Sequence, residues 1–181
     1  MRTSLLAASL AAIAAVTSHT AFANTGPIYF SGEINSSTCP IEVVDPGHGG
    51  ALNPIQMGSV PASRLAASGD QAGGRSFALQ VPEGSVCGLT ADGTATVTFE
   101  SQNGAAGNHY AIRAQSGAAR NVAIGIKDNA GTFVNHQTAS KAYPIKLDAQ
   151  NELLFSAVYV ATGAAAPGIA DADIKFLVDI Q

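Results

Sequence analysis

The two cysteines, Cys39 and Cys87, are the residues whose chemistry the sequence defines most clearly. Their spacing excludes a CxxC redox motif or a zinc-binding CxxC pair. In an exported protein an even pair indicates one disulfide, which would close a loop of about 49 residues and contribute roughly 4 kcal/mol in the chain-entropy model. Two buried free thiols are the alternative. A disulfide would place the protein in an oxidising compartment, the periplasm or the cell exterior.

Three histidines, His48, His109 and His136, lie among Gly, Asn or Gln residues without a ligand-like partner nearby in sequence. We therefore expect surface-loop histidines rather than a metal site. Asp171 and Asp173 are two positions apart on the polar face of an expected strand, where solvent is the usual neighbour. Nucleophile elbows, zincin motifs and paired catalytic carboxylates are absent from the sequence. The sequence predicts a protein that is not an enzyme and uses no cofactor.

Residues 1–23 have the pattern of a secretory signal peptide. Arg2 precedes an apolar run over residues 5–16, and Ala21-Phe22-Ala23 supplies a small-residue cleavage site. The run is too short to span a bilayer and no other segment approaches the required length, so we expect no membrane insertion. Removing Arg2 leaves eight of the nine basic residues against 13 acidic ones, a net charge of −5 for residues 24–181. This acidity argues against nucleic acid or anionic lipid as partners.

The elements that must position these residues are expected to be β-strands, because Gly and other turn residues recur between short apolar runs. The last stretch, residues 168–181, alternates most clearly, with Ile174, Phe176, Val178 and Ile180 as its apolar row. A period of two predicts a half-buried strand. Such a strand needs a neighbour on each side unless it forms an edge.

A second alternating stretch, residues 26–34, carries Ile28, Phe30, Gly32 and Ile34 on one face. A glycine on the buried face weakens a strand unless another backbone approaches closely at that point. Residues 153–160 are apolar on both sides, which predicts a central strand buried on both faces. The remaining strands are expected within residues 39–44, 54–60, 75–82, 94–100, 110–114, 122–127, 133–135 and 143–147, with loops over 62–74 and 161–167. Together they predict an all-β, two-sheet sandwich.

Several segments, in this order and spacing, resemble the structural subunits of chaperone–usher pili, the type 1 fimbrial major pilin-like family. The resemblance covers essentially the whole chain after the signal peptide. The segments are Phe30-Ser-Gly32-Glu-Ile34 before Cys39, Met57-Gly58-Ser-Val60 with Ser63, Phe77-Ala-Leu-Gln-Val81 before Cys87, Asn121-Val-Ala-Ile-Gly-Ile-Lys-Asp128, Phe155-Ser-Ala-Val-Tyr159-Val-Ala-Thr162, and Gly168 near the end.

The resemblance implies an incomplete immunoglobulin-like β-sandwich that lacks its final strand and is completed by donor-strand insertion from a neighbouring subunit. It divides the chain into a signal peptide (1–23), an N-terminal donor-strand extension (24–35) and a pilin domain (36–181). The donor strand would carry Ile28, Phe30, Gly32 and Ile34; alternatively, this row belongs to the domain's own sheet. The acceptor groove and chaperone-recognition element would comprise Gly168, Ile174, Phe176, Val178 and Ile180. Family members usually have tyrosine at the penultimate position, where this chain has Ile180.

The implied function is a structural fimbrial subunit that polymerises by donor-strand exchange into surface fibres mediating cell adhesion. The implied partners are a periplasmic pilus chaperone, the outer-membrane usher and other copies of itself or related pilins; a host-surface receptor is a further candidate. The implied route runs through the periplasm to the fimbrium on the bacterial cell surface. The alternatives are a minor or adaptor pilus subunit and an adhesive carbohydrate-binding fimbrial protein.

Overall fold

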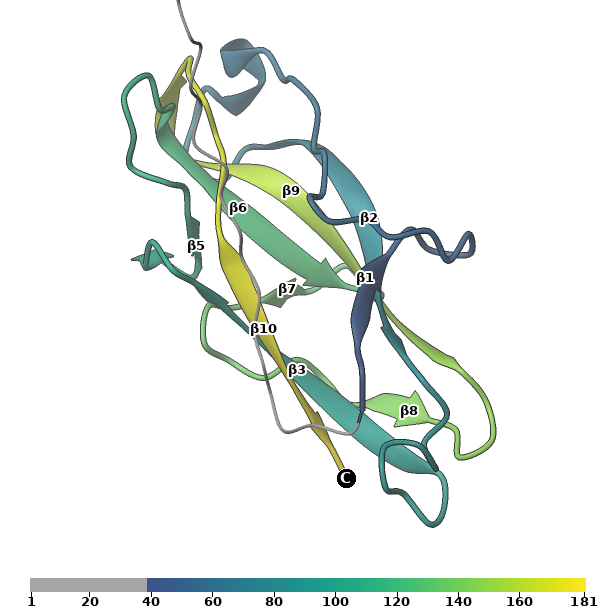
Figure 1. Cartoon of the computed structure of the whole chain (residues 1–181). Helices are drawn as coiled ribbons and strands as arrows, with labels where there is room; N and C mark the ends of the chain where they lie inside the picture. Colours follow the sequence, from purple (N-terminus) through teal and green to yellow (C-terminus); the bar gives the residue numbers. More distant parts are fainter. Residues whose placement is uncertain (1–38) are drawn as a thin grey trace, which may run out of the picture. The chain divides into compact units, whose positions relative to one another are not determined.

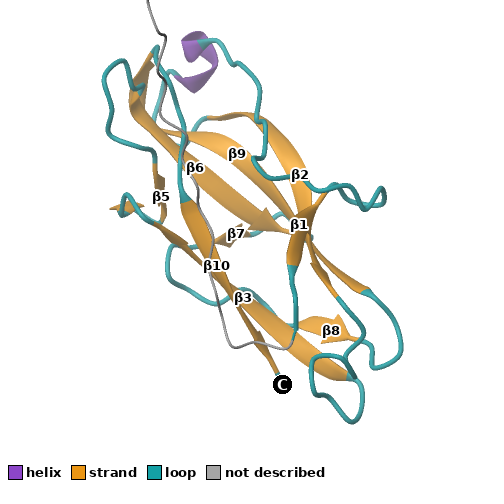
Figure 2. Cartoon of the chain, viewed as in Figure 1, coloured by secondary structure: helices purple, strands orange, loops and turns teal. Residues whose placement is uncertain are grey.

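The computed structural model describes residues 39–181, and these residues form two antiparallel β-sheets (Figure 1; Figure 2). The larger sheet has the strand order β1-β2-β9-β6-β5-β4, with β7 paired to β6, and the smaller sheet has the order β10-β3-β8. The strands are β1 (Glu42–Val44), β2 (Gln71–Val81), β3 (Gly93–Ser101), β4 (Ala105–Ala106), β5 (His109–Ala111), β6 (Arg120–Asp128), β7 (Phe133–Val134), β8 (Tyr143–Ile145), β9 (Asn151–Ala166) and β10 (Ile174–Ile180). The prediction of an all-β, two-sheet sandwich is confirmed.

The core lies between the inner faces of the two sheets and is centred on aromatic rings. Phe77 of β2, Phe99 of β3 and Phe155 of β9 are each 3% exposed. The ring of Phe155 lies 5.0 Å from that of Phe99, edge to face, and 5.7 Å from that of Phe77, centroid to centroid. Phe77 and Phe155 are also register partners in the ladder between β2 and β9. The period-two pattern of these strands therefore predicted the buried faces correctly.

β9 is the central strand of the larger sheet, paired with β2 on one side and β6 on the other. It differs from the prediction in two respects. Leu154 is 39% exposed on the outer face, so this part of the strand is not buried on both faces. The strand also continues through residues 161–166, which were expected to form a loop; Ala166 pairs with Arg120 across a bulge, and the Asn121 amide donates to the Ala164 carbonyl at 2.8 Å. Pairing with β6 overrides the weak strand propensity of Gly163 and the alanines.

Residues 54–60 form no strand, which contradicts the prediction. Gly58 has φ 75°, a left-handed conformation that interrupts an extended backbone. Ile55 and Met57 still pack against the core, so the apolar alternation is real although no neighbouring strand pairs with it. A further short element, the 3-10 helix Ala62–Leu65, lies in the connection that was expected to be a loop, and its Leu65 is buried with Ala72 and Ala161 in a second, smaller cluster.

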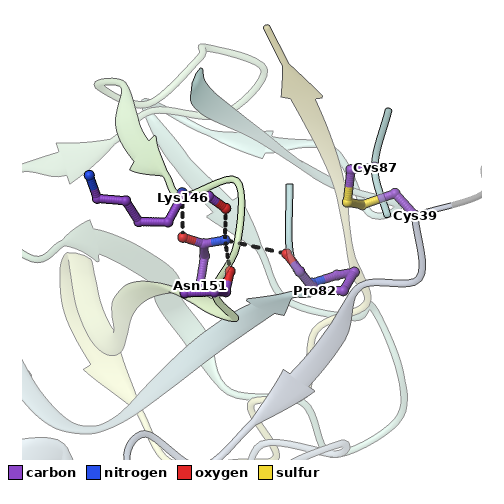
Figure 3. The surroundings of a disulfide bond; sticks show 6 residues. Cys39, Pro82, Cys87, Lys146 and Asn151 are labelled. Carbon is purple, nitrogen blue, oxygen red and sulfur yellow. Dashed lines mark hydrogen bonds between the residues drawn. A yellow bond between two sulfur atoms is a disulfide. The ribbon is translucent and has the colours of Figure 1, made fainter. Parts of the chain in front are cut away.

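The predicted disulfide is present between Cys39 and Cys87, whose Cα atoms are 4.5 Å apart (Figure 3). Nearby, the buried Asn151 joins the end of β2 to the turn before β9. Its amide nitrogen lies 3.3 Å from the carbonyl oxygens of Pro82 and Lys146, and its carbonyl accepts from the Lys146 amide at 2.8 Å. The turn beside the disulfide is thus fixed by hydrogen bonds that satisfy a buried polar side chain.

Candidate functional site

Within residues 39–181, five strands have a strand neighbour on one side only: β1, β4, β7, β8 and β10, of which β10 is the longest. β4 has two residues, while β1 and β8 have three each. The outer side of β1 is partly covered, because Leu52 donates to the Val43 carbonyl and Gly50 accepts from the Asp45 amide. β10 has seven residues and pairs with β3 alone among the described residues. Long uncovered edge strands are uncommon in folded domains, because they invite pairing with another chain.

The hydrogen-bond pattern shows which backbone groups of β10 face away from β3. Gln181 and Thr94 exchange two hydrogen bonds of 2.8 Å, and Asp173 accepts from the Gln102 amide at 2.9 Å. Because hydrogen-bonded pairs alternate in an antiparallel ladder, the odd-numbered residues of β10 bond to β3. The even-numbered residues, Ile174 to Ile180, therefore direct their N–H and C=O groups outward, where no strand within residues 39–181 pairs with them.

The same even-numbered residues carry the apolar row that packs against the core, and this row is only half-buried. Ile174, Phe176, Val178 and Ile180 all retain intermediate exposure. Their register partners on β3 include Phe99, Val97 and Ala95, which are 3%, 0% and 1% exposed. The core is thus closed at β3 and incompletely covered at β10. The opposite face of β10 is solvent-exposed, including Leu177 at 69%.

Apolar residues on the β1 side are also incompletely buried against the same core: Cys39, Ile41, Val43, Leu52, Ile55 and Met57. This set lies in β1 and the segments flanking it, far from β10 in sequence. Incomplete burial therefore affects both ends of the described chain, and also Cys87, Leu89, Ile112 and Tyr159 between them, whereas most inward residues of β2, β3 and β9 are fully buried. Partly exposed apolar area of this kind marks a candidate interaction surface.

Gly168 does not lie on β10, although it was grouped with the β10 row in the predicted acceptor site. β10 begins at Ile174 rather than at residue 168, and residues 168–173 cross from the larger sheet to the smaller one. A Cβ at Gly168 would come within 2.6 Å of the Gly117 carbonyl oxygen, so only glycine fits there. Glycine is therefore required at position 168 because two backbone segments approach each other closely there.

Asp173 also departs from the expectation of a solvent-facing strand residue. It precedes β10, and its carboxylate accepts two hydrogen bonds from the Arg113 guanidinium, at 3.0 Å and 2.6 Å. These bonds hold the pKa of Asp173 below its ordinary value. The two residues are 60 positions apart in sequence, and no local pattern pointed to the pair.

The expectation of surface-loop histidines holds for His48, which is exposed, and for the loop position of His136, which lies in a turn but is partly buried; it is wrong for His109. His109 lies on β5 with its ring 4.8 Å from that of Phe133, and burial lowers its pKa. The His109 Nδ1 and His136 Nε2 atoms are buried and have no hydrogen-bond partner among the described residues. Across residues 39–181 there is no cluster of three or more His, Cys, Asp or Glu side chains arranged to hold a metal ion.

The predicted donor residues Ile28, Phe30, Gly32 and Ile34, like the signal peptide, lie outside the described residues. Among residues 39–181 no helix has the length and apolar character needed to cross a membrane. The candidate site is thus the outer edge of β10, which combines outward-directed backbone groups with a half-buried apolar row. Its chemistry is main-chain hydrogen bonding and apolar contact, the requirements of an added β-strand.

Known proteins share both the sequence and this fold. The sequence profile of the family described as "Fimbrial protein" matches residues 28–181. The S-fimbrial protein subunit SfaA of Escherichia coli O6:K15:H31 is 32% identical over 162 residues, 87% of this chain and 84% of the relative. The type-1 fimbrial protein A chain of Escherichia coli K12 is 31% identical, over 96% of this chain and 91% of the relative.

A chain from a solved chaperone–usher pilus, described in connection with rod uncoiling, superposes with a TM-score of 0.58 at 19% identity, over 91% of this chain and 100% of that one. That likeness concerns the fold, which is the immunoglobulin-like fold of chaperone–usher pilus subunits. The profile match and the two relatives concern the sequence itself. The resemblance drawn from the sequence is confirmed: the chain belongs to the fimbrial protein family.

Proposed function

We propose that this member of the fimbrial family is a structural subunit that polymerises into surface fibres by accepting a β-strand along the outer edge of β10. The observation that carries the proposal is the coincidence, on one seven-residue strand, of outward-directed backbone groups and a half-buried apolar row. Main-chain hydrogen bonds along an exposed edge give affinity, and alternate side chains give register. A strand added at this edge would pair with the outward-directed backbone groups and cover the half-buried apolar row.

The donor of that strand is first a periplasmic chaperone and then, at the outer-membrane usher, residues 24–35 of the next copy or of a related pilin. Ile28, Phe30 and Ile34 of the incoming segment would enter the partly covered core beside Ile174 to Ile180. Gly32 would lie where the backbones approach most closely. The support is the matching period of two in both segments and the resemblance of each to its counterpart in the family.

The proposal divides the chain into a signal peptide (1–23), a donor extension (24–35) and a pilin domain (36–181). Export through the periplasm to the bacterial cell surface follows from that division, and the disulfide Cys39–Cys87 is consistent with an oxidising compartment. In the chaperone-bound subunit, Ile180 would take the place of the family's penultimate tyrosine. Its half-buried side chain retains the apolar contact without the hydroxyl.

The test introduces Phe30→Asp or Gly32→Trp in the donor segment. A charge at Phe30 would have to enter an apolar core, and an indole at Gly32 would block backbone approach. We expect each variant to be recovered in complex with the chaperone but absent from surface fibres, as measured by co-purification from the periplasm and by shearing fibres from cells.

Ser31→Asp is the matched control, because the alternation of the sequence predicts that residue 31 lies on the opposite face of the added strand. It should assemble normally. Normal fibres from Phe30→Asp and Gly32→Trp would overturn the donor assignment.

The adhesive role and the rank of the subunit are separate parts of the proposal. A major subunit should dominate the protein of sheared fibres, whereas a minor or adaptor subunit would be present in a few copies. Quantitative mass spectrometry of sheared fibres decides between them. Loss of host-cell binding on deletion of this subunit, with fibres still present, would instead favour a receptor-binding role.

A further inference from the structure

The chain leaves the larger sheet at Ala166 and enters the smaller one at Ile174, and the crossing residues are fastened to the loop between β5 and β6. Ile169 donates to the Gly117 carbonyl at 2.9 Å, and Ala119 donates to the Ile169 carbonyl at 2.8 Å. The missing side chain of Gly168 permits this approach. We call residues 113–119 and 168–173 together the crossover clamp.

Arg113 links the loop between β5 and β6 to the residues that immediately precede β10. Its backbone amide donates to the Asp171 carbonyl at 2.6 Å, and its guanidinium donates two bonds to the Asp173 carboxylate. The Asp173 carbonyl accepts from Gln102, at the end of β3. Asp173 is therefore bonded to residues that closely follow β5 of the larger sheet and β3 of the smaller sheet, immediately before β10 begins. A two-bond guanidinium–carboxylate pair fixes direction as well as distance.

We propose that Arg113 is a positioning residue for the binding of an added strand. Through Asp173 it holds the first residues of β10, Ile174 to Phe176, in place while β10 has a neighbour on one side only. This inference rests on the proposed function. At its other end, β10 is fixed by the paired bonds between Gln181 and Thr94. Without the Arg113 bonds, the end of β10 that carries Ile174 and Phe176 frays, because strand ends with a single neighbour open readily.

The effect of the clamp depends on whether the outer edge of β10 is occupied. An added strand supplies its own main-chain bonds to the even-numbered residues of β10, so in the completed complex the strand is held from both sides. The Arg113–Asp173 pair then contributes little. Loss of the pair should consequently slow capture of a strand while leaving its release almost unchanged, a signature that a general loss of stability would not produce.

The experiment starts from the full chain in complex with its chaperone, because removal of the chaperone strand leaves the outer edge of β10 open until a synthetic peptide of residues 24–35 pairs with it. Native mass spectrometry follows the replacement of the chaperone by the peptide, and release is followed by chasing the labelled peptide with unlabelled peptide. We expect Arg113→Gln and Asp173→Asn to slow capture about three- to fivefold, the range for a partly exposed pair with two bonds, and to change release by less than about twofold.

Arg75→Gln is the matched control. The Arg75–Asp45 pair is as exposed as the Arg113–Asp173 pair, with side chains 43% and 38% exposed against 45% and 39%, but it joins β2 to the segment after β1. Its loss should leave both rates unchanged. The charge-swapped double variant, Arg113→Asp with Asp173→Arg, should recover at least half of the lost capture rate, and it keeps the test available if a single variant fails to fold.

Each outcome bears on a different claim. If the wild-type complex takes up no peptide, the proposed function fails and the clamp inference fails with it. If the wild type takes up peptide and Arg113→Gln captures it equally fast, only the clamp inference is overturned. The same holds if Arg75→Gln slows capture to the same extent, if release accelerates in step with slower capture, or if the double variant stays as slow as the single ones.

Discussion

In the three-stranded sheet, β8 and β10 lie on opposite sides of the central strand β3. They form its two edges, and these edges differ. β8 has three residues, of which Tyr143 and Ile145 are 4% and 0% exposed, and Pro144 between them lacks an N–H. β10 has seven residues, no proline, and an inward row that is only half-buried. The fold therefore protects one edge of this sheet against pairing and leaves the other able to accept a strand.

The protection of the β8 side extends along the rest of β3. Gln137 donates to the Phe99 carbonyl, Ser140 donates to the Val97 carbonyl, and the Ser140 hydroxyl accepts from the Val97 amide at 3.0 Å. The segment before β8 thus forms hydrogen bonds with the backbone groups of β3 without forming a long strand of its own. An edge built from turns and one proline presents few aligned backbone groups to another chain.

The largest expected effect comes from a charge in the inward row of β10. Phe176→Asp should reduce fibre formation at least about a hundredfold, because the carboxylate would be buried once a strand covers the edge. Leu177→Asp is the matched control: it is the next residue of the same strand and is 69% exposed on the outer face. Heat-resistant polymers on denaturing gels measure both. Equal loss in the two variants would mean that the faces of β10 do not differ in function.

A proline on β10 should make its outer edge less able to pair with another strand, as Pro144 does for β8. Val178→Pro removes one outward-directed N–H while leaving the bonds of Asp179 and Leu177 to β3 intact. We expect strand binding to weaken about tenfold, because one ladder bond is lost and the ring crowds the incoming strand. The dissociation temperature of isolated polymers is the measurement. An unchanged temperature would show that β10 does not use its outward backbone groups.

A polar truncation on β8 should affect stability and leave assembly unchanged. The Tyr143 hydroxyl donates to the Leu154 carbonyl at 3.0 Å, and burial raises its pKa to about 12. Tyr143→Phe removes this bond and should cost about 1 kcal/mol of unfolding free energy. Urea unfolding of the subunit completed by a donor peptide measures the loss. Fibre yield should be normal; reduced yield would assign the β8 edge a role in assembly that the comparison denies it.

The smallest effect expected is a pH dependence that arises away from both edges. Burial lowers the pKa of His109 from its ordinary 6.5, so the unfolded chain binds this proton more readily than the folded one. Stability is therefore full above about pH 6.5 and declines as the pH falls below it. His109→Gln should remove this decline in urea-unfolding midpoints between about pH 6.5 and 5. If the unfolding midpoint of the variant still falls over this pH range, His109 is not the source of the decline.

Periodicity predicted much of this fold, because burial on one face of a strand leaves a direct trace in sequence. Phe77, Leu79 and Val81 on β2 and the row Ile174 to Ile180 on β10 were identified in this way. The same pattern failed at Ile55 and Met57, where apolar residues alternate without a pairing strand. It failed again at Gly163–Ala166, a segment of β9 that is held by its neighbour β6 rather than by its own propensity.

The candidate site could be predicted in part. The apolar row of β10 was visible, and the resemblance suggested that a neighbour was missing beside it. That β3 is the neighbour on one side depends on tertiary pairing, for which no local pattern exists. The Arg113–Asp173 pair could not be found either, because its members are distant in sequence and each alone is an ordinary surface residue.

The seven-residue register between β10 and β3, from Ile174 opposite Ser101 to Ile180 opposite Ala95, has a mechanical consequence. Under the proposed function, tension on a fibre would pull the strand added to β10 along its own axis. Because the ladder lies parallel to that pull, its hydrogen bonds are loaded together in shear instead of being peeled apart one at a time. The force would then pass through β3 into the closed core, so the edge proposed to accept a strand would also bear load.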